Sequence, residues 1–189
     1  MTQKTNVISP KGIASYAFVF NPQQSMNAGQ EPKYSITVLV DEDEDLSEMK
    51  RVVVAAATKK FGDRARKLIK SGRLQLPFRN GDEEREDDPL YAGKIFFSAK
   101  SGTKPQVVDR KKKLIEDPMD FYSGCICRVS VNAYGYDVNG NKGVAFGLNN
   151  VQKLEDGDRI AGRRPAADDF DTWGDDDDSE LFDDDSDLI

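Results

Sequence analysis

The sequence contains no histidine and only two cysteines among its 189 residues. Histidine is the commonest general base in enzymes and, together with cysteine, the usual ligand of structural zinc. Hydrolases that use a Ser-His or Cys-His pair are therefore excluded, and so is a four-ligand zinc site built from soft ligands. Enzymes that use carboxylates and magnesium stay open, but we expect neither a cofactor nor a metal.

Long apolar runs are absent as well. No stretch approaches the ~18 consecutive apolar residues of a membrane span, and Met1 to Lys11 lacks the apolar centre of a signal peptide. We therefore expect no membrane contact and a reducing, cytoplasmic location. Cys125 and Cys127 lie two apart in a strand-like run, so they share a sheet face and are expected to be packed thiols, not a disulfide.

The net charge of −7 combines two regions of opposite sign. Residues 166–189 contain twelve acidic side chains and no basic one, which leaves 22 acids and 27 bases, a net charge of +5, in residues 1–165. This asymmetry indicates a body that binds a polyanion and a tail that serves interactions.

Apolar residues interrupt the acidic tail, namely Phe170, Trp173, Leu181, Phe182, Leu188 and Ile189. Acids with apolar anchors are typical of a disordered segment that orders when it docks on a basic, apolar groove of a partner protein. The tail could also occupy the polyanion site of its own chain. A tail that only improves solubility is the alternative.

Hydrophobic patterning predicts a mainly β domain with one inserted helix. The expected strands are 12–20, 33–40, 94–100, 106–109, 122–136 and 143–151, with an Asn139-Gly140 turn between the last two. This order fits a Greek-key β-barrel of the OB-fold type. We expect the binding domain to span residues 1–157 and a linker with the disordered acidic tail to span residues 158–189.

A helix is predicted between the second and third strands. Asp45 and Glu48 fit a capping box, an apolar stripe follows at helical spacing, and Gly62 ends the helix. A short basic helix then reaches Ile69. Residues 73–88 are expected to form a long exposed loop with a turn at Asn80-Gly81.

Two strands place cations and aromatic rings on one face. Lys94, Phe96 and Lys100 alternate in the first strand, while Arg128, Asn132, Tyr134 and Tyr136 lie opposite an apolar face in the second. Cations that follow phosphates, with rings that stack on unpaired bases, suit single-stranded DNA. The alternative is that Phe96 belongs to the core and the tyrosines only favour strand structure.

A basic run supplies further candidates for phosphate contact: Lys104, Arg110, Lys111, Lys112 and Lys113. A solvated loop is the alternative for this run. The acids of residues 41–45 do not make a calcium loop, because the sixth position is Leu46 and the twelfth is Val52. Those of residues 82–88 could serve a two-metal nuclease, but we favour a solvated loop and predict no catalytic residue.

Five segments resemble a bacteriophage single-stranded DNA-binding protein family first catalogued as a domain of unknown function. They read KYSITVLV, LPFRNGDEE, KPQVVDR, FYSGCICRVSVNAY and GNKGVAFGLNNVQKLEDGDRIAGR, and the similarity runs from about Gly12 to Phe170. The resemblance implies an OB-fold protein that coats single-stranded DNA during phage replication and recombination, in the cytoplasm of the infected bacterial host.

The acidic tail is similar in design to tails that recruit replication proteins and weaken DNA binding in cis. Many of those tails end in phenylalanine, whereas this one ends in Leu188-Ile189. We expect a non-enzymatic, sequence-independent protein whose partners are single-stranded DNA and replication or recombination proteins, and which could form a homo-oligomer on DNA. An acidic DNA mimic or adaptor is the alternative.

Overall fold

A computed structural model of the chain describes residues 5–160 and residue 170. Its elements, in chain order, are β1 (Asn6–Ile8), β2 (Gly12–Gln23), β3 (Lys33–Asp41), α1 (Ser47–Phe61), η1 (Gly62–Arg64), α2 (Ala65–Lys70), β4 (Arg79–Asn80), α3 (Gly81–Glu84), η2 (Pro89–Tyr91), β5 (Lys94–Ser101), β6 (Gln106–Val108), β7 (Ile126–Val138) and β8 (Asn141–Glu155).

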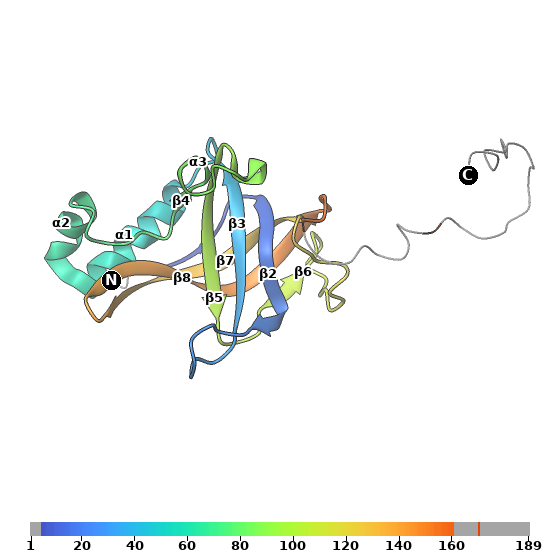
Figure 1. The fold of residues 1–189 in the computed structure, drawn as a ribbon, viewed down its shortest axis with the longest axis horizontal. Coiled ribbons are helices and arrows are strands. Elements are labelled where there is room, and N and C mark those ends of the chain that lie inside the picture. The colour runs from blue at the N-terminus through green and yellow to red at the C-terminus, as the bar shows by residue number, and fades with distance from the viewer. Residues whose placement is uncertain (1–4, 161–169, 171–189) are drawn as a thin grey trace, which may run out of the picture.

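Five strands close into a barrel (Figure 1). β2 pairs antiparallel with β3, and β3 with β5. β5 pairs parallel with β8, β8 returns antiparallel to β7, and β7 pairs with β2. This is the predicted OB-type Greek-key barrel, and its closure removes the free sheet edges that would otherwise pair with other chains.

The core lies inside this barrel and under α1. Val38, Phe97 and Val129 are fully buried, and the Phe97 ring meets that of Phe146 edge-on, with centroids 5.4 Å apart. The apolar stripe of α1 is buried as predicted: Met49, Val52, Val53, Ala56, Ala57 and Phe61. β7 crosses this helix at Gly135, where a Cβ atom would lie 2.5 Å from the Cβ of Lys60. Only glycine permits that close approach.

The predicted hairpin between the last two strands is confirmed. Asn139 and Gly140 have φ angles of 51° and 85°, as a two-residue type I′ turn requires. β7 starts later than predicted, at Ile126, because residues 122–125 turn instead of extending. Gly124 has a φ of 116°, and a Cβ atom there would lie 1.9 Å from the carbonyl oxygen of Asp158.

Two expectations about local structure are wrong. Asp45 makes no capping box, since its carboxylate accepts hydrogen bonds from the backbone and hydroxyl of Ser47. Residues 73–88 are not simply an exposed loop. Leu74 is buried, and Asn80 caps α3 by accepting a hydrogen bond from the backbone of Asp82. Short helical turns hold this segment against the barrel, and sequence periodicity cannot detect elements of this length.

The two thiols are buried, free and unpaired with each other, as predicted. Cys127 lies on the inward face of β7, and burial raises the pKa of its thiol to about 12. The ionised thiolate is therefore strongly disfavoured in the folded protein.

This pKa predicts an alkaline loss of stability. Above pH ~9 the unfolded chain releases the Cys127 proton while the folded chain retains it, so the free energy of unfolding falls by about 1.4 kcal/mol per pH unit up to the folded pKa. We expect chemical denaturation to show this slope in the wild type relative to Cys127→Ala, with no pH-dependent difference below pH ~8. Parallel stability curves for the two proteins up to pH ~11 would contradict it.

Candidate nucleic-acid interface

A groove of about 600 Å³ runs along the outer side of β2. Its walls come from β2, from the η2 turn and from residues 118–123, and Arg159 and Ile160 complete it. Aromatic side chains dominate the lining: Tyr16, Phe18, Phe20, Tyr91, Phe121 and Tyr122.

A backbone irregularity in β2 directs one of these rings outward. Pairing with β3 shifts register between Ser15 and Phe18, and Tyr16 adopts a φ of 46°. Such a bulge redirects a side chain at the expense of backbone strain. The Tyr16 side chain is consequently 54% exposed on a strand whose neighbouring residues are mostly covered.

Tyr122 is held in place from several sides. Its hydroxyl donates a 2.9 Å hydrogen bond to the carbonyl of Gly157, and the Arg159 guanidinium lies 3.8 Å from its ring centroid. Burial, the largest cause, raises the pKa of the phenol, so it stays neutral at physiological pH. The ring is therefore a fixed, uncharged surface with a cation over it.

Lys153 keeps a positive charge beside the same ring, with its Nζ 5.5 Å from the centroid. Burial alone would lower the pKa of Lys153, yet the hydrogen bond from its ammonium to Asp156 outweighs burial, and the pKa is raised.

The predicted basic run forms a structured turn between β6 and β7. The Asp109 carboxylate accepts hydrogen bonds from the backbone of Lys111 at 2.8 Å and of Lys113 at 2.9 Å. All four cations from Arg110 to Lys113 are exposed at its tip. Arg128 joins its base, because it donates to Gln152, whose amide donates to the Asp109 carbonyl.

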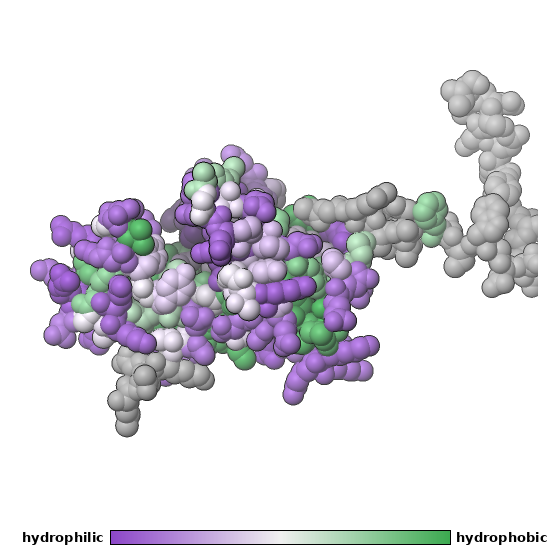
Figure 2. Space-filling model, turned by 90° about the horizontal axis from the view of Figure 1, so that it is seen from below, coloured by the Kyte–Doolittle hydropathy of each residue, from purple (hydrophilic) through white to green (hydrophobic). Residues whose placement is uncertain are grey.

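Two more predicted lysines lie near the end of β5. Lys104 stands 6.0 Å from the centroid of Phe20, a residue that also lines the aromatic groove. Lys100 borders a hollow of about 330 Å³ together with Lys33. Figure 2 shows an apolar area, in green, bordered by purple hydrophilic groups at this end of the barrel.

The prediction that Phe96 offers its ring to bases is wrong. Phe96 is 2% exposed, with Tyr91 edge-on at 5.0 Å and the Arg79 guanidinium 4.9 Å from its ring. Residues 79–91 fold over the outer face of the barrel and bury it with Leu39. Lys94 is likewise engaged, since it forms an ion pair with Asp41 on the neighbouring strand.

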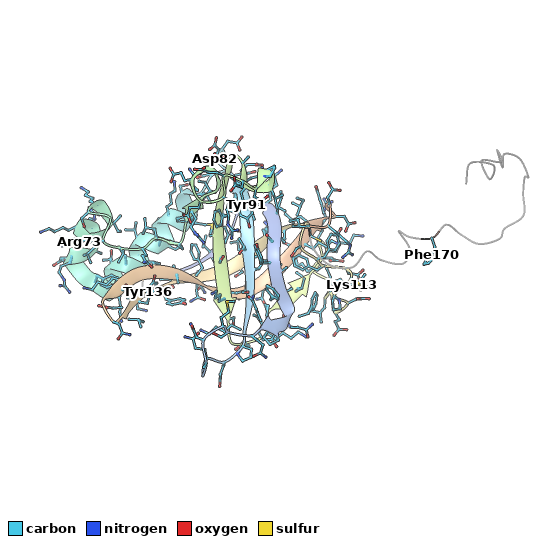
Figure 3. All side chains as sticks on the ribbon, viewed as in Figure 1. Arg73, Asp82, Tyr91, Lys113, Tyr136 and Phe170 are labelled. Carbon is cyan, nitrogen blue, oxygen red and sulfur yellow. The ribbon has the colours of Figure 1, made fainter. Side chains whose placement is uncertain are left out.

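The predicted tyrosines of β7 lie away from the groove. Figure 3 shows Tyr136 near Arg73, toward the opposite end of the molecule from Lys113. Tyr136 donates a 2.8 Å hydrogen bond to Gln75, and its ring covers Gly143. Asn132 packs against Gly147, whereas Tyr134 is 45% exposed. The structure thus divides the predicted set between two ends.

Acids that could have served a nuclease have structural roles instead. The Asp82 carboxylate accepts a hydrogen bond from Gly93, and that of Asp88 accepts one from Leu90. Within the described part of the chain, no group of three or more acids or thiols is arranged to hold a metal ion. Nor does that part contain a helix long and apolar enough to cross a membrane.

Of the predicted tail anchors, Phe170 is 77% exposed, and Trp173, Leu181, Phe182, Leu188 and Ile189 lie outside the described residues. The prediction missed Tyr16, Phe18, Phe20, Tyr122 and Arg159 as groove residues. One signal was present, because Tyr16, Phe18 and Phe20 alternate along one strand.

The model of the family described as the Enterobacter phage Enc34 ssDNA-binding protein matches residues 5–181. The chain belongs to this family. A curated relative of the chain, protein p50 of Acyrthosiphon pisum secondary endosymbiont phage 1, is 32% identical over 151 residues, which are 76% of this chain and 80% of that protein.

Solved structures share the fold of this Enc34-family chain. The single-stranded DNA-binding protein from bacteriophage Enc34 in complex with ssDNA is 24% identical, with a TM-score of 0.62 over 83% of this chain and 90% of that one. Bacteriophage T7 gp2.5, a single-stranded DNA-binding protein, is 20% identical, with a TM-score of 0.60 over 93% of this chain and 100% of that one.

The burial of Phe96 predicts a structural role for its ring. We expect Phe96→Ala to lower the free energy of unfolding by about 3–5 kcal/mol, because it leaves a cavity under Tyr91. Tyr16→Ala, at an exposed position, is expected to change stability by less than about 0.5 kcal/mol. Urea denaturation measures both, and equal losses would contradict this assignment.

Proposed function

We propose that this chain binds single-stranded DNA without sequence preference and coats it during phage DNA replication and recombination. One observation carries the proposal: an aromatic groove on an OB-type barrel, with cations at both its ends. Bases of any sequence present a π-face that stacks on Tyr16, Phe18 or Tyr122, while phosphates lie near Arg159 and Lys104. The mechanism is binding alone, with no catalytic step.

The groove extends the predicted site in a specific direction. Phe20 links it to Lys104, and the exposed Arg110–Lys113 turn follows β6 on the same side of the barrel. We assign stacking to the aromatic groove and phosphate contact to Lys100, Lys104, Arg128 and the turn. Membership of a single-stranded DNA-binding family supports this assignment.

Residues 1–157 are the proposed binding domain, and residues 158–189 the linker and acidic tail, acting in the cytoplasm of an infected bacterium. We propose that the tail recruits replication or recombination proteins through its apolar anchors and competes with DNA through its twelve acids.

Removing one stacking ring tests the groove. We expect Tyr16→Ala and Tyr122→Ala each to weaken binding of oligothymidylate by about 1–3 kcal/mol, which is ~5- to 150-fold in Kd. Fluorescence anisotropy with labelled oligothymidylate at fixed salt measures the change.

Val54→Ala is the matched control for these variants, because Val54 is a comparably exposed side chain, 40% accessible, on α1. We expect it to leave Kd unchanged. In parallel, replacing Lys111, Lys112 and Lys113 by Gln should reduce the slope of log K against log salt by about 2, at ~0.7 per phosphate. Absence of any binding at low salt would refute the proposal, and unchanged affinity in the tyrosine variants would move the site elsewhere.

The tail gives a separate prediction. Deleting residues 166–189 changes the net charge from −7 to +5. The truncated chain should bind oligothymidylate more tightly, with the largest gain at low salt, where charge competition is least screened. Affinity that is equal to or weaker than that of the full chain would exclude competition by the tail.

A further inference from the structure

Positive charge is concentrated at the end of the molecule opposite the groove. Residues 59–73, which cover the end of α1, η1, α2 and the turn after it, contain seven cations and one acid. The cations are Lys59, Lys60, Arg64, Arg66, Lys67, Lys70 and Arg73. We call this segment the basic cap.

The basic cap accounts for the whole positive excess of the body. Residues 1–165 hold 27 bases and 22 acids, so without residues 59–73 they hold 20 bases and 21 acids. The rest of the body, the groove included, is close to neutral.

These charges are uncompensated within the structure. All seven cations are exposed, and none takes part in an ion pair with another described residue, whereas Arg51, Arg79, Lys94, Lys142 and Lys153 do. Clustered like charges repel one another and lower stability. A polyanionic partner would remove that cost.

The cap is a rigid part of the fold. Phe61 and Ala65 are buried in the main core and fix the end of α1 and the start of α2 to the barrel. The cations therefore have fixed positions on the surface, so binding does not require the cap itself to order.

The groove and the cap face different ends. α2 lies on one side of Figure 1 and the β6 region on the other, and Figure 3 places Arg73 and Lys113 at opposite ends. A ligand on the cap is therefore separate from bases held beside Tyr122.

We propose that the basic cap is a second nucleic-acid site, which binds the phosphate backbone of a further DNA segment while the groove holds the first. This rests on the proposed function and adds to it the capacity to hold two segments at once. An exposed ring is also present, because Tyr134 shares a hollow with Lys59 and Lys60.

The acidic tail of a second copy is the competing occupant, and the surface suits it less well. The tail carries apolar anchors that need apolar pockets, yet no large apolar side chain between Val54 and Leu76 is exposed. A phosphate backbone needs only cations and hydrogen-bond donors.

Native mass spectrometry of the full-length protein tests the proposal by counting oligonucleotides per chain. We expect wild type to bind two short oligothymidylates, and the triple variant Arg66→Gln, Lys67→Gln and Lys70→Gln to bind the second at least tenfold more weakly. The control triple Lys11→Gln, Lys50→Gln and Arg51→Gln removes the same charge elsewhere and should still bind two. A duplex oligonucleotide offered as the second ligand tells whether the cap takes single-stranded or duplex backbone.

A cap variant that still binds two, or a wild type that binds only one, would overturn the second site and leave the groove intact. A wild type that binds none would overturn the proposed function as well. If a peptide of residues 166–189 fills the second position and no oligonucleotide does, the cap belongs to an acidic peptide and the proposal fails. Circular dichroism of each variant verifies that the fold is retained.

Discussion

The long antiparallel pairing of β7 with β8 joins the two ends of the sheet, and the barrel exists only because this pairing is made. β7 also pairs with β1 and β2, while β8 pairs with β5 and β6. The inward face of β7 alternates Cys127, Val129, Val131 and Ala133, all buried, so a shift of one residue would expose the core. The Asn139-Gly140 turn sets that register, and the core maintains it.

The candidate interface is built on extensions of the same two strands. Arg128 on β7 and Gln152 on β8 support the turn that carries Arg110 to Lys113. Beyond the end of β8, Gly157 receives the hydroxyl of Tyr122, and Arg159 covers that ring. Barrel closure therefore positions both the cations and the stacking rings, and a loosened β7–β8 pairing would disturb them together.

The sequence predicted what depends on periodicity and missed what depends on coverage. Alternation predicted the barrel strands and the inward face of β7, and helical spacing predicted the stripe of α1. The same alternation placed Phe96 on an outer face, correctly, but it could not show that residues 79–91 fold over that face. The outward turn of Tyr16 depends on a bulge, and the stacking of Arg159 on Tyr122 depends on contacts between distant segments. Neither follows from local pattern.

Charge required the structure in a different way. Counting residues showed a positive body and a negative tail, and the natural inference placed the positive charge at the DNA site. The fold separates the two, because the groove is aromatic and nearly neutral while the excess charge is on the basic cap. Stacking on rings and attraction to phosphates are different interactions, and here different ends of the barrel supply them.

This separation bears on how the acidic tail would act. Arg159 and Ile160 line the groove, and the tail begins a few residues later in the chain. A competitor tethered at the wall of a site acts intramolecularly, so its effect does not depend on protein concentration. Competition at the groove would then be a property of each single chain, whereas a tail that reached the basic cap of another chain would compete more strongly as protein concentration rises. The concentration dependence of the tail effect thus distinguishes which of the two surfaces the acids occupy.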